Sequence, residues 1–314
     1  MNTLEGKAWQ ALAAVDGIGA KALWQIAEFL HCQGKTASWL LKNREQAGGA
    51  WKGIKLNAPL PDPDVLNGWE GGAIEEQEVT VLHPLHPGFP GRIRDLKDRL
   101  ILPAILYAAG NLSILKRPGV AVVGRRDAGP EPRAVAEELA FRLAAGGINV
   151  ISGYAPGIDS AAHLGALRSK GTTTMVLAEG LDHFQVKPEF RGLVTDANAL
   201  VVSQFSTGST WAAYRAMARN KLVAALSAVM VVVVSGPEHE AGGRMSGTFD
   251  AGASALKLGL TLFVADPAFF PSLPAGNQQL IARGGRPWNP SRGIEPILAA
   301  MGPDAQEPGQ KKLF

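Results

Sequence analysis

Two glycine-punctuated loops, each following an apolar segment, carry the groups of this 314-residue chain best suited to bind phosphate. They supply glycines, a hydroxyl and guanidinium groups: Gly124, Arg125, Arg126, Ser152, Gly153 and Gly157. Backbone N–H groups beside glycines and planar arginine forks are typical phosphate ligands. The preceding segments, 120–123 and 149–152, predict buried parallel strands, whose following loops leave the same sheet edge. The sequence therefore predicts a phosphate site at that edge, although solvated surface arginines remain an alternative.

Neither loop has the spacing of a nucleotide-binding motif. The first lacks the three glycines of GxGxxG, and the second strand ends in Ser152-Gly153 where a ribose-binding acid is expected. The chain also contains no GxxxxGK[ST] loop. These absences exclude nicotinamide chemistry and nucleoside triphosphate hydrolysis of the P-loop type.

A third group of candidates lies in residues 209–227, for which we expect a helix. It contains aromatic and cationic side chains at helical spacing: Trp211, Tyr214, Arg215, Arg219 and Lys221. Three of them recur every four residues and would share one face. Aromatic rings interleaved with cations suit a single-stranded nucleic acid, because bases stack on the rings while cations follow the backbone. Tyr154, in the second loop, is a further stacking candidate; a solvated basic helix with a buried aromatic face is the alternative.

A fourth motif opens another helix with Ser246, Gly247 and Thr248, where either anion binding or simple N-capping would explain the residue types. Asp159 and His163 are four residues apart on one expected helix, close enough to pair. Because no nucleophile accompanies them, we expect them to cap the helix and orient the loop rather than catalyse. The histidines and single cysteine show no metal-ligand spacing, so we expect no metal, no cofactor and no catalysis.

Composition indicates a soluble cytoplasmic protein. Hydrophobic residues make up 46% of the chain, but no apolar run is long enough for a membrane span, and the N-terminus lacks a signal-peptide pattern. Cys32 is the single cysteine, which excludes an intramolecular disulfide. The net charge of +3 is too small to demonstrate a polyanionic partner, so evidence for a nucleic-acid partner must come from local clusters of basic residues.

These motifs require an α/β scaffold, a Rossmann-like doubly wound parallel sheet. The expected strands are 105–110, 120–123, 149–152, 173–177, 199–202, 229–234 and 260–265, with helices at 130–145 and 158–169. We divide the chain into a small all-helical domain at 1–70, a linker at 71–82, the Rossmann-like domain at 83–295 and a flexible tail at 302–314.

The small N-terminal domain is expected to hold helices at 7–15, 22–30 and 36–45, in a SAM-like or helix-hairpin-helix-like arrangement. Between the first two helices, Gly17-Ile18-Gly19 precedes Lys21. Such a turn allows backbone N–H groups to approach a DNA phosphate, but an ordinary helix–helix turn explains the same residues.

Residues 80–290 taken together resemble the DNA-processing protein A family, DprA or Smf. The resemblance rests on VAVVGRRDAG, ISGYAPGIDSAAHLGAL, ARNKLVAALS, SGTFDAGASALKLG and GNQQLIARGG, in that order. It implies a non-enzymatic protein of recombination and natural transformation that binds single-stranded DNA, presents it to the RecA recombinase and forms a homodimer. It also implies that Arg125 or Arg126, Ser152, Gly153, Gly157, Arg219, Asn220 and Lys221 line the DNA groove.

Several positions depart from the family pattern. Pro156 stands where many members have arginine, and residues 216–218 lack the family's ring and cation. Gln204 and Ala251 replace a usual glutamate and threonine. The sequence ends without the winged-helix domain that many members carry, so we expect a divergent member whose DNA contacts are altered.

Three other interpretations remain open. Residues 242–248 partly resemble a phosphoribohydrolase motif, with Arg244 and Asp250 acting on a ribosyl phosphate, so a nucleotide-ligand sensor or such an enzyme is the alternative function. A scaffold whose loops bind protein is another. The tail motif, formed by Gln310, Leu313 and Phe314, resembles the peptide with which bacterial DNA enzymes dock on the replication sliding clamp.

Overall fold

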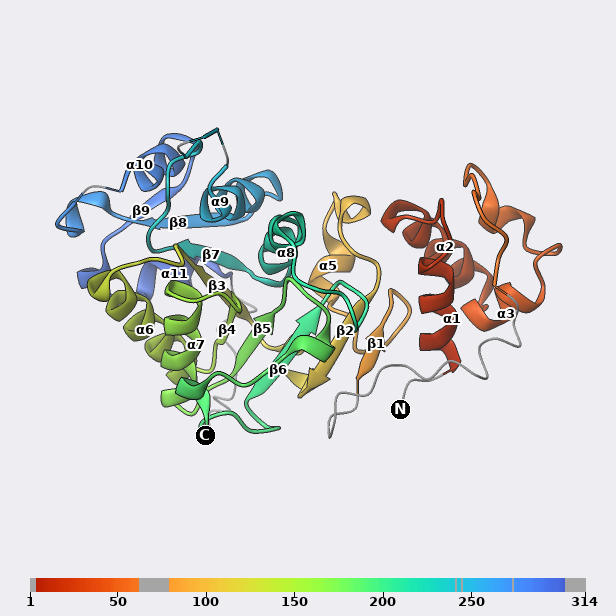
Figure 1. Ribbon diagram of the computed structural model, residues 1–314, viewed down its shortest axis with the longest axis horizontal. Helices are drawn as coiled ribbons and strands as arrows, with labels where there is room; N and C mark the ends of the chain where they lie inside the picture. Colours follow the sequence, from red (N-terminus) through yellow and green to blue (C-terminus); the bar gives the residue numbers. More distant parts are fainter. Residues whose placement is uncertain (1–3, 62–78, 241, 244, 273, 303–314) are drawn as a thin grey trace, which may run out of the picture.

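A nine-stranded sheet forms the centre of the computed structural model, which describes residues 4–61, 79–240, 242–243, 245–272 and 274–302 (Figure 1). Its strand order is β1-β2-β6-β5-β4-β3-β7-β8-β9. The strands are β1 Thr80–Leu82, β2 Leu106–Gly110, β3 Gly119–Val123, β4 Asn149–Gly153, β5 Thr173–Val176, β6 Ala199–Ser203, β7 Val229–Val232, β8 Thr261–Ala265 and β9 Arg286–Trp288.

The expected doubly wound topology is confirmed. From β3 the chain builds β4, β5 and β6 toward one side and β7, β8 and β9 toward the other, with every adjacent pair in this region parallel. Every residue of β3 and β4 is buried, as strands covered on both faces require. The short β1 and β2 add an antiparallel edge, and β1 is formed by the last three residues of the expected linker.

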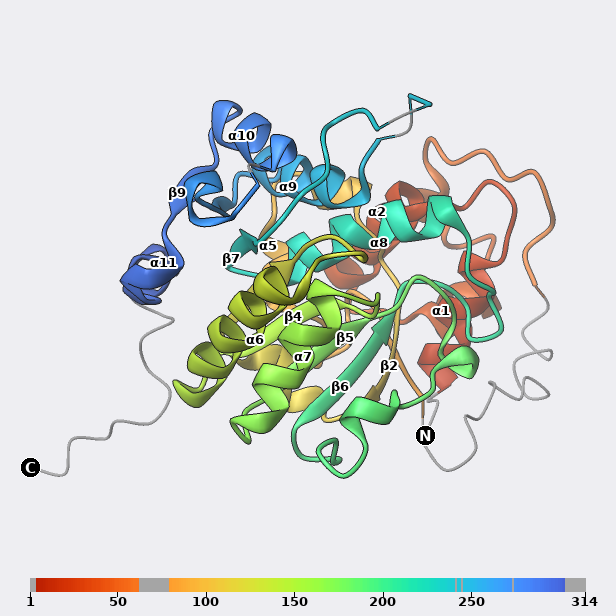
Figure 2. The ribbon, with the colours of Figure 1, turned by 60° about the vertical axis from the view of Figure 1, so that its left-hand side comes forward.

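Helices cover both faces of the sheet (Figure 2). On one face lie α6 Pro130–Ala145, α7 Ile158–Arg168 and α11 Glu295–Ala300; on the other lie α8 Ala213–Leu226, α9 Gly247–Lys257 and α10 Ala275–Ala282. The alternation along β3 explains this, because Val120 and Val122 face the α6 side while Ala121 and Val123 face the α8 side.

The start of α8 differs from the sequence prediction in a way that changes the site. We expected a helix over 209–227, but α8 begins at Ala213 after an extended Ala212 with φ −149° and ψ 150°. Trp211 therefore precedes the helix and does not share a helical face with Arg215 and Arg219. Its position in the site follows from the loop rather than from helical spacing.

Residues 4–61 contain three helices that pack against the β1–β2 edge (Figure 1). These are α1 Leu4–Ala13, α2 Ala20–Gln33 and α3 Ala37–Lys42; α5 Gly91–Asp95 lies between β1 and β2 in sequence. The indole Nε1 of Trp24 donates to the Leu102 carbonyl at 3.1 Å, and the Trp9 ring stacks on His83 with centroids 5.2 Å apart. The helical segment thus shares its hydrophobic core with the sheet edge.

Short 3-10 helices connect the remaining elements: η1 Gly48–Trp51, η2 Arg99–Ile101, η3 Leu112–Lys116, η4 Leu181–His183, η5 Pro188–Phe190, η6 Pro267–Phe269 and η7 Pro290–Arg292. The turn at residues 17–19 packs against the segment at 55–57, where the Asn57 N–H donates to the Asp16 carbonyl at 3.0 Å. In the described parts of the chain, no helix is both long and apolar enough to cross a membrane.

Candidate nucleic-acid interface

A groove of about 630 Å³ lies at the carboxyl edge of the sheet and brings together all four sequence motifs. Of the candidates, ten line it: Gly124, Arg125, Arg126, Trp211, Tyr214, Arg219, Asn220, Ser246, Gly247 and Thr248. Six others lie outside its lining: Ser152, Gly153, Tyr154, Gly157, Arg215 and Lys221. Residues almost 130 positions apart in sequence therefore face one space.

The two glycine loops lie in direct contact, as expected from the order of their strands. The Ile158 N–H donates to the Arg125 carbonyl at 3.3 Å. Gly157 has φ +79°, and a Cβ there would lie 2.4 Å from the Arg125 carbonyl oxygen and 2.5 Å from that of Arg126. Glycine is therefore required at position 157 for two reasons, the left-handed backbone and the close approach of the first loop.

The two arginines of the first loop differ in availability. Asp127 holds the Arg125 guanidinium with both carboxylate oxygens, at 2.7 Å from Nε and 2.8 Å from Nη2, and Glu240 lies 3.5 Å from Nη1. These hydrogen bonds between Arg125 and Asp127 lower the pKa of Asp127 and raise the pKa of Arg125. Arg126 is exposed, makes no ion pair within the described residues, and lies 5.6 Å from the Trp211 ring centroid. Arg126 is thus the arginine of this loop whose charge is available for a phosphate.

The variant Asp127→Asn is expected to tighten binding of a labelled oligo-dT by about fivefold at low salt, because it removes a charge that competes with phosphate for Arg125. Fluorescence anisotropy measures the change. Asp196→Asn, which neutralises an exposed carboxylate before β6, is the matched control and should leave affinity unchanged. Equal or weaker binding by Asp127→Asn would contradict this assignment.

Two exposed aromatic side chains line the groove, Trp211 at 51% and Tyr214 at 67% exposure. Exposed aromatic faces of this kind can stack with unpaired bases. Arg215 lies beside them but donates to the Thr210 carbonyl and stacks over Phe205 and Tyr214, at 5.6 and 5.5 Å from the ring centroids. It holds the segment before α8 rather than lining the groove.

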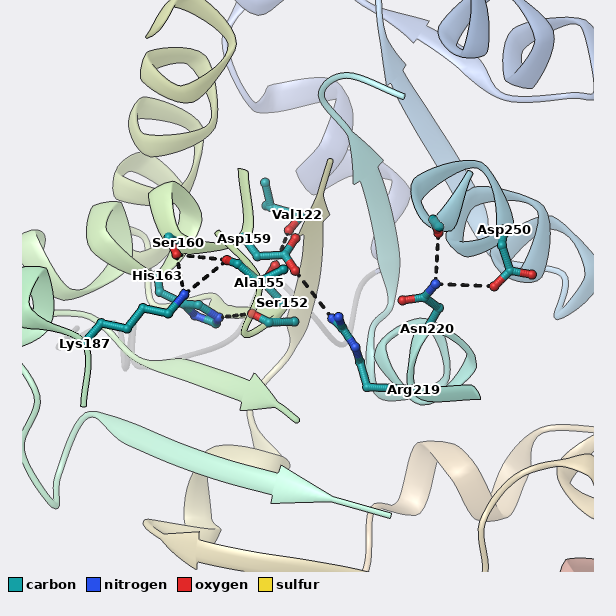
Figure 3. A network of polar contacts seen from close by, with 12 residues as sticks. Val122, Ser152, Ala155, Asp159, Ser160, His163, Lys187, Arg219, Asn220 and Asp250 are labelled. Atoms are coloured by element: carbon teal, nitrogen blue, oxygen red, sulfur yellow. Dashed lines mark hydrogen bonds and ion pairs between the residues drawn. The ribbon is translucent and has the colours of Figure 1, made fainter. Parts of the chain in front are cut away.

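A buried ion pair forms the floor of the groove (Figure 3). Arg219 Nη1 lies 3.4 Å from Asp159 Oδ2, and both side chains are less than a tenth exposed. Burial lowers the pKa of Arg219 and raises that of Asp159, and each partner opposes the shift in the other. A Cβ at Gly153 would lie 1.3 Å from Arg219 Nη1, so the glycine leaves the space for this pair.

Asp159 and His163 do not pair with each other, and neither caps α7, whose N-cap Gly157 provides no side-chain hydrogen bond. The capping part of our expectation is therefore wrong, whereas the loop-orienting part is confirmed. Burial lowers the pKa of His163 to about 3, so the ring is neutral. Its Nε2–H donates to the Gly153 carbonyl at 2.6 Å, and Nδ1 lies 2.7 Å from the Thr173 hydroxyl.

Tyr154 lies away from the groove, in a cluster of the second loop. Its hydroxyl donates to the Gln185 carbonyl at 2.9 Å, and the Lys187 ammonium covers its ring at 4.4 Å. Lys187 Nζ also donates to the Ser160 hydroxyl at 2.6 Å (Figure 3). Ser152 is buried as well and donates to the Val122 carbonyl. These contacts tie the second loop to the segment at 185–187 and the end of β4 to β3.

The first turn of α9 opens onto the groove without a side-chain cap. Ser246 is the N-cap residue, but its side chain accepts no hydrogen bond from the helix, so the simple capping alternative is wrong. Asn220 Nδ2 donates to the Gly247 carbonyl at 2.9 Å and to Asp250 at 3.3 Å, which ties α8 to α9. Asp250 is thereby engaged away from the groove lining, and Arg244 lies outside the described residues.

Sequence reasoning missed three residues that shape the groove. Asp127 and Glu240 supply the carboxylates around Arg125, and Met245 adds an exposed apolar side chain. Asp127 is two residues from Arg125, so a carboxylate partner could have been suspected from the sequence. Glu240 comes from the loop after β7, and no local sequence pattern predicts that it lies beside Arg125. The described residues contain no group of three potential metal ligands.

Comparison with known proteins shows the family of this chain. The family described as DNA recombination-mediator protein A matches residues 80–298. The DNA processing protein DprA of Streptococcus pneumoniae is 32% identical over 193 residues, which cover 61% of this chain and 66% of that protein. The protein Smf of Synechocystis is 29% identical over 242 residues, which cover 74% and 59%. The matches therefore span about three fifths to two thirds of these relatives' lengths.

Two solved structures share the fold. The X-ray structure of DprA from Streptococcus pneumoniae superposes with a TM-score of 0.66 at 22% identity, covering 94% of this chain and 98% of that one. DNA processing protein A from Helicobacter pylori, whose structure concerns its single-stranded DNA binding mode, gives a TM-score of 0.58 at 26% identity and covers 72% and 99%. With the family match extending over most of the described sheet, the chain belongs to the DNA recombination-mediator protein A family.

Proposed function

We propose that this protein binds single-stranded DNA in the groove at the carboxyl edge of the sheet and presents it to the RecA recombinase. The observation that carries the proposal is the convergence of Arg126, Trp211, Tyr214 and the uncapped first turn of α9 on one space. Because its ligand is cellular DNA, we propose a cytoplasmic location.

The groove offers each part of a single strand a matching surface. Arg126 and the N–H groups at the start of α9 suit backbone phosphates. Trp211 and Tyr214 offer exposed faces for unpaired bases, which a duplex hides within its stack. The buried Arg219–Asp159 pair is not exposed enough to serve as a flexible phosphate contact, so it acts as a rigid, polar floor.

We propose that the function involves no catalysis by this chain. Asp159 is held by Arg219, and both His163 nitrogens are engaged by protein groups, so neither is poised toward a substrate. The phosphoribohydrolase alternative gains no support, because Asp250 bonds to Asn220 and does not line the groove.

Trp211→Ala is expected to weaken oligo-dT binding by about 10- to 100-fold, because base stacking on one aromatic side chain contributes on the order of 1–3 kcal/mol. Arg126→Gln is expected to flatten the dependence of log K on log salt by about 0.7, the value for one phosphate contact on a single strand. Fluorescence anisotropy across a salt series, with duplex competitor, measures both.

Lys257→Gln is the matched control for lost charge, since Lys257 is an exposed cation at the far end of α9. It should leave both the affinity and the salt slope unchanged. Unaltered binding by Trp211→Ala and Arg126→Gln, or a preference for duplex DNA, would contradict the proposal that single-stranded DNA binds in the groove. If the intact protein binds no DNA, a nucleotide-ligand screen becomes the next test.

The assembly partners are part of the same proposal. Family resemblance supports a homodimer, and light scattering of the purified chain tests it. Gln310, Leu313 and Phe314 lie outside the described residues, so the clamp-binding tail rests on the sequence motif alone. Co-elution with a sliding clamp that persists after deletion of 310–314 would refute that role.

A further inference from the structure

A second cleft, of about 460 Å³, lies at the opposite, amino edge of the sheet. It is bordered by the chain entering β3 at Pro118 and Gly119, the chain entering β7 at Ala228, and the segment that includes α5. Four cations line it: Arg92, Arg94, Lys116 and Arg117. None of the candidate site residues named above lines this cleft.

Among the residues that the structure describes, the cations of this cleft have no carboxylate partner. None of the described residues that line it is Asp or Glu, and none of the four cations forms an ion pair with a described residue. Arg125 in the groove, by contrast, has two carboxylate partners. Like charges gathered without counter-charges repel one another, and a bound anion would relieve that cost.

Arg94 adds an independent observation. Its Nη2 donates to the His86 carbonyl and its guanidinium lies 5.6 Å from the Phe89 ring centroid, but its Nε is buried without a hydrogen-bond partner. Arg92 donates only a long bond of 3.4 Å, to the Ala228 carbonyl. The exposed Arg92 guanidinium therefore keeps donor capacity that a phosphate oxygen could use, whereas the buried Nε of Arg94 shows that its charge is not fully compensated by described residues.

Apolar side chains line the cleft together with the cations: Phe89, Leu115, Leu226 and Met301. A cleft lined by both cations and apolar side chains suits a ligand that joins phosphate to a flat organic ring. We propose that this basic cleft binds the phosphate groups of nucleotides, supplied by a nucleic-acid strand that also occupies the groove.

The cleft is separate from the groove. The two sites lie at opposite ends of β3, whose five residues span roughly 16 Å at about 3.3 Å each. A strand must therefore pass around the protein to reach both, so the cleft is expected to affect long DNA and leave short DNA unaffected. This inference extends the proposed function, since the groove would hold DNA with or without the cleft.

The test compares four forms of the full chain by anisotropy with dT6 and dT30 across a salt series. The cleft variant is Lys116→Gln/Arg117→Gln, which changes two exposed side chains. The control, Lys257→Gln/Arg286→Gln, removes the same charge from exposed positions outside both sites. Trp211→Ala serves as the groove variant and wild type as the reference.

The cleft variant is expected to bind dT6 like wild type and dT30 about tenfold more weakly, with the salt slope lowered by about 1.4 for two phosphates. The groove variant should lose affinity for both lengths. Binding of dT30 by the cleft variant that matches the control overturns the inference, and so does an equal loss for dT6 and dT30.

If wild type binds neither oligonucleotide, the proposed groove function fails, and titration with dTDP and with pyrophosphate, followed by phosphorus NMR, decides the cleft separately. Binding of dTDP or pyrophosphate that the cleft variant loses identifies free phosphate compounds as the source of the ligand. Absence of binding by wild type, or binding that the cleft variant retains, rejects the cleft as a phosphate site.

Discussion

Asp159→Ala is expected to lower the free energy of unfolding by about 3–5 kcal/mol, because it leaves the buried Arg219 guanidinium without its counter-charge. Arg219 Nε already lacks a hydrogen-bond partner, so little nearby can compensate. Urea denaturation of the variant and wild type measures the difference. An effect of this size would make the pair under the groove one of the main single contributions to the stability of the site.

Two comparisons make the Asp159 result specific. Glu138→Ala removes one partner of the exposed Arg142–Glu138 pair on α6 and is expected to cost at most about 0.5 kcal/mol. The double variant Asp159→Asn/Arg219→Met removes both charges and should recover most of the loss. If Asp159→Ala costs no more than Glu138→Ala, the buried pair does not stabilise the site.

Acidification from pH 7 to pH 5 is expected to reduce the free energy of unfolding by about 2 kcal/mol through His163 alone. The pKa of this ring falls from 6.5 to about 3 on folding because burial disfavours its charged form. Because the pKa is lower in the folded state, the unfolded chain takes up the proton at a higher pH than the folded chain does. Stability is therefore full above pH 6.5 and is lost as the pH falls from there toward 3.

The variant His163→Asn isolates this contribution. Asparagine does not titrate, so the variant should be less stable at pH 7 but should lose about 2 kcal/mol less than wild type between pH 7 and pH 5. His83, also buried with a pKa lowered to about 3, continues to titrate in both proteins. His31→Gln, at an exposed position, is the control. Parallel pH profiles for wild type and His163→Asn would rule the mechanism out.

The central sheet was predictable because its strands are short apolar runs separated by helical segments. The segments expected at 149–152 and 199–202 correspond to β4 and β6 with one residue added to each, and α6 has the predicted bounds. β1 and β9 were not predicted. Each has three residues, and β9 contains Pro287, which edge strands tolerate but which weakens any strand signal.

Local sequence patterns did not predict the start of α8, and the reason is different from that for β1 and β9. Residues 209–212 have acceptable helix formers, and Trp211 falls at the right spacing from Arg215. Tertiary contacts decide otherwise, because the Trp211 ring meets Arg126 from the first loop and the chain stays extended at Ala212. Helical periodicity carries no information about a cation that lies 85 residues earlier.

The sequence by itself determined which segments meet at the carboxyl edge, because buried parallel strands send their loops to one side. Only the tertiary structure decided which charges there are available. Arg125 is held by Asp127 and Glu240, Arg219 is buried against Asp159, and Arg126 alone of the three is exposed and makes no ion pair with a described residue. The availability of a charge depends on burial and on its partners; apart from Asp127, these partners come from distant segments, which the local sequence pattern does not predict.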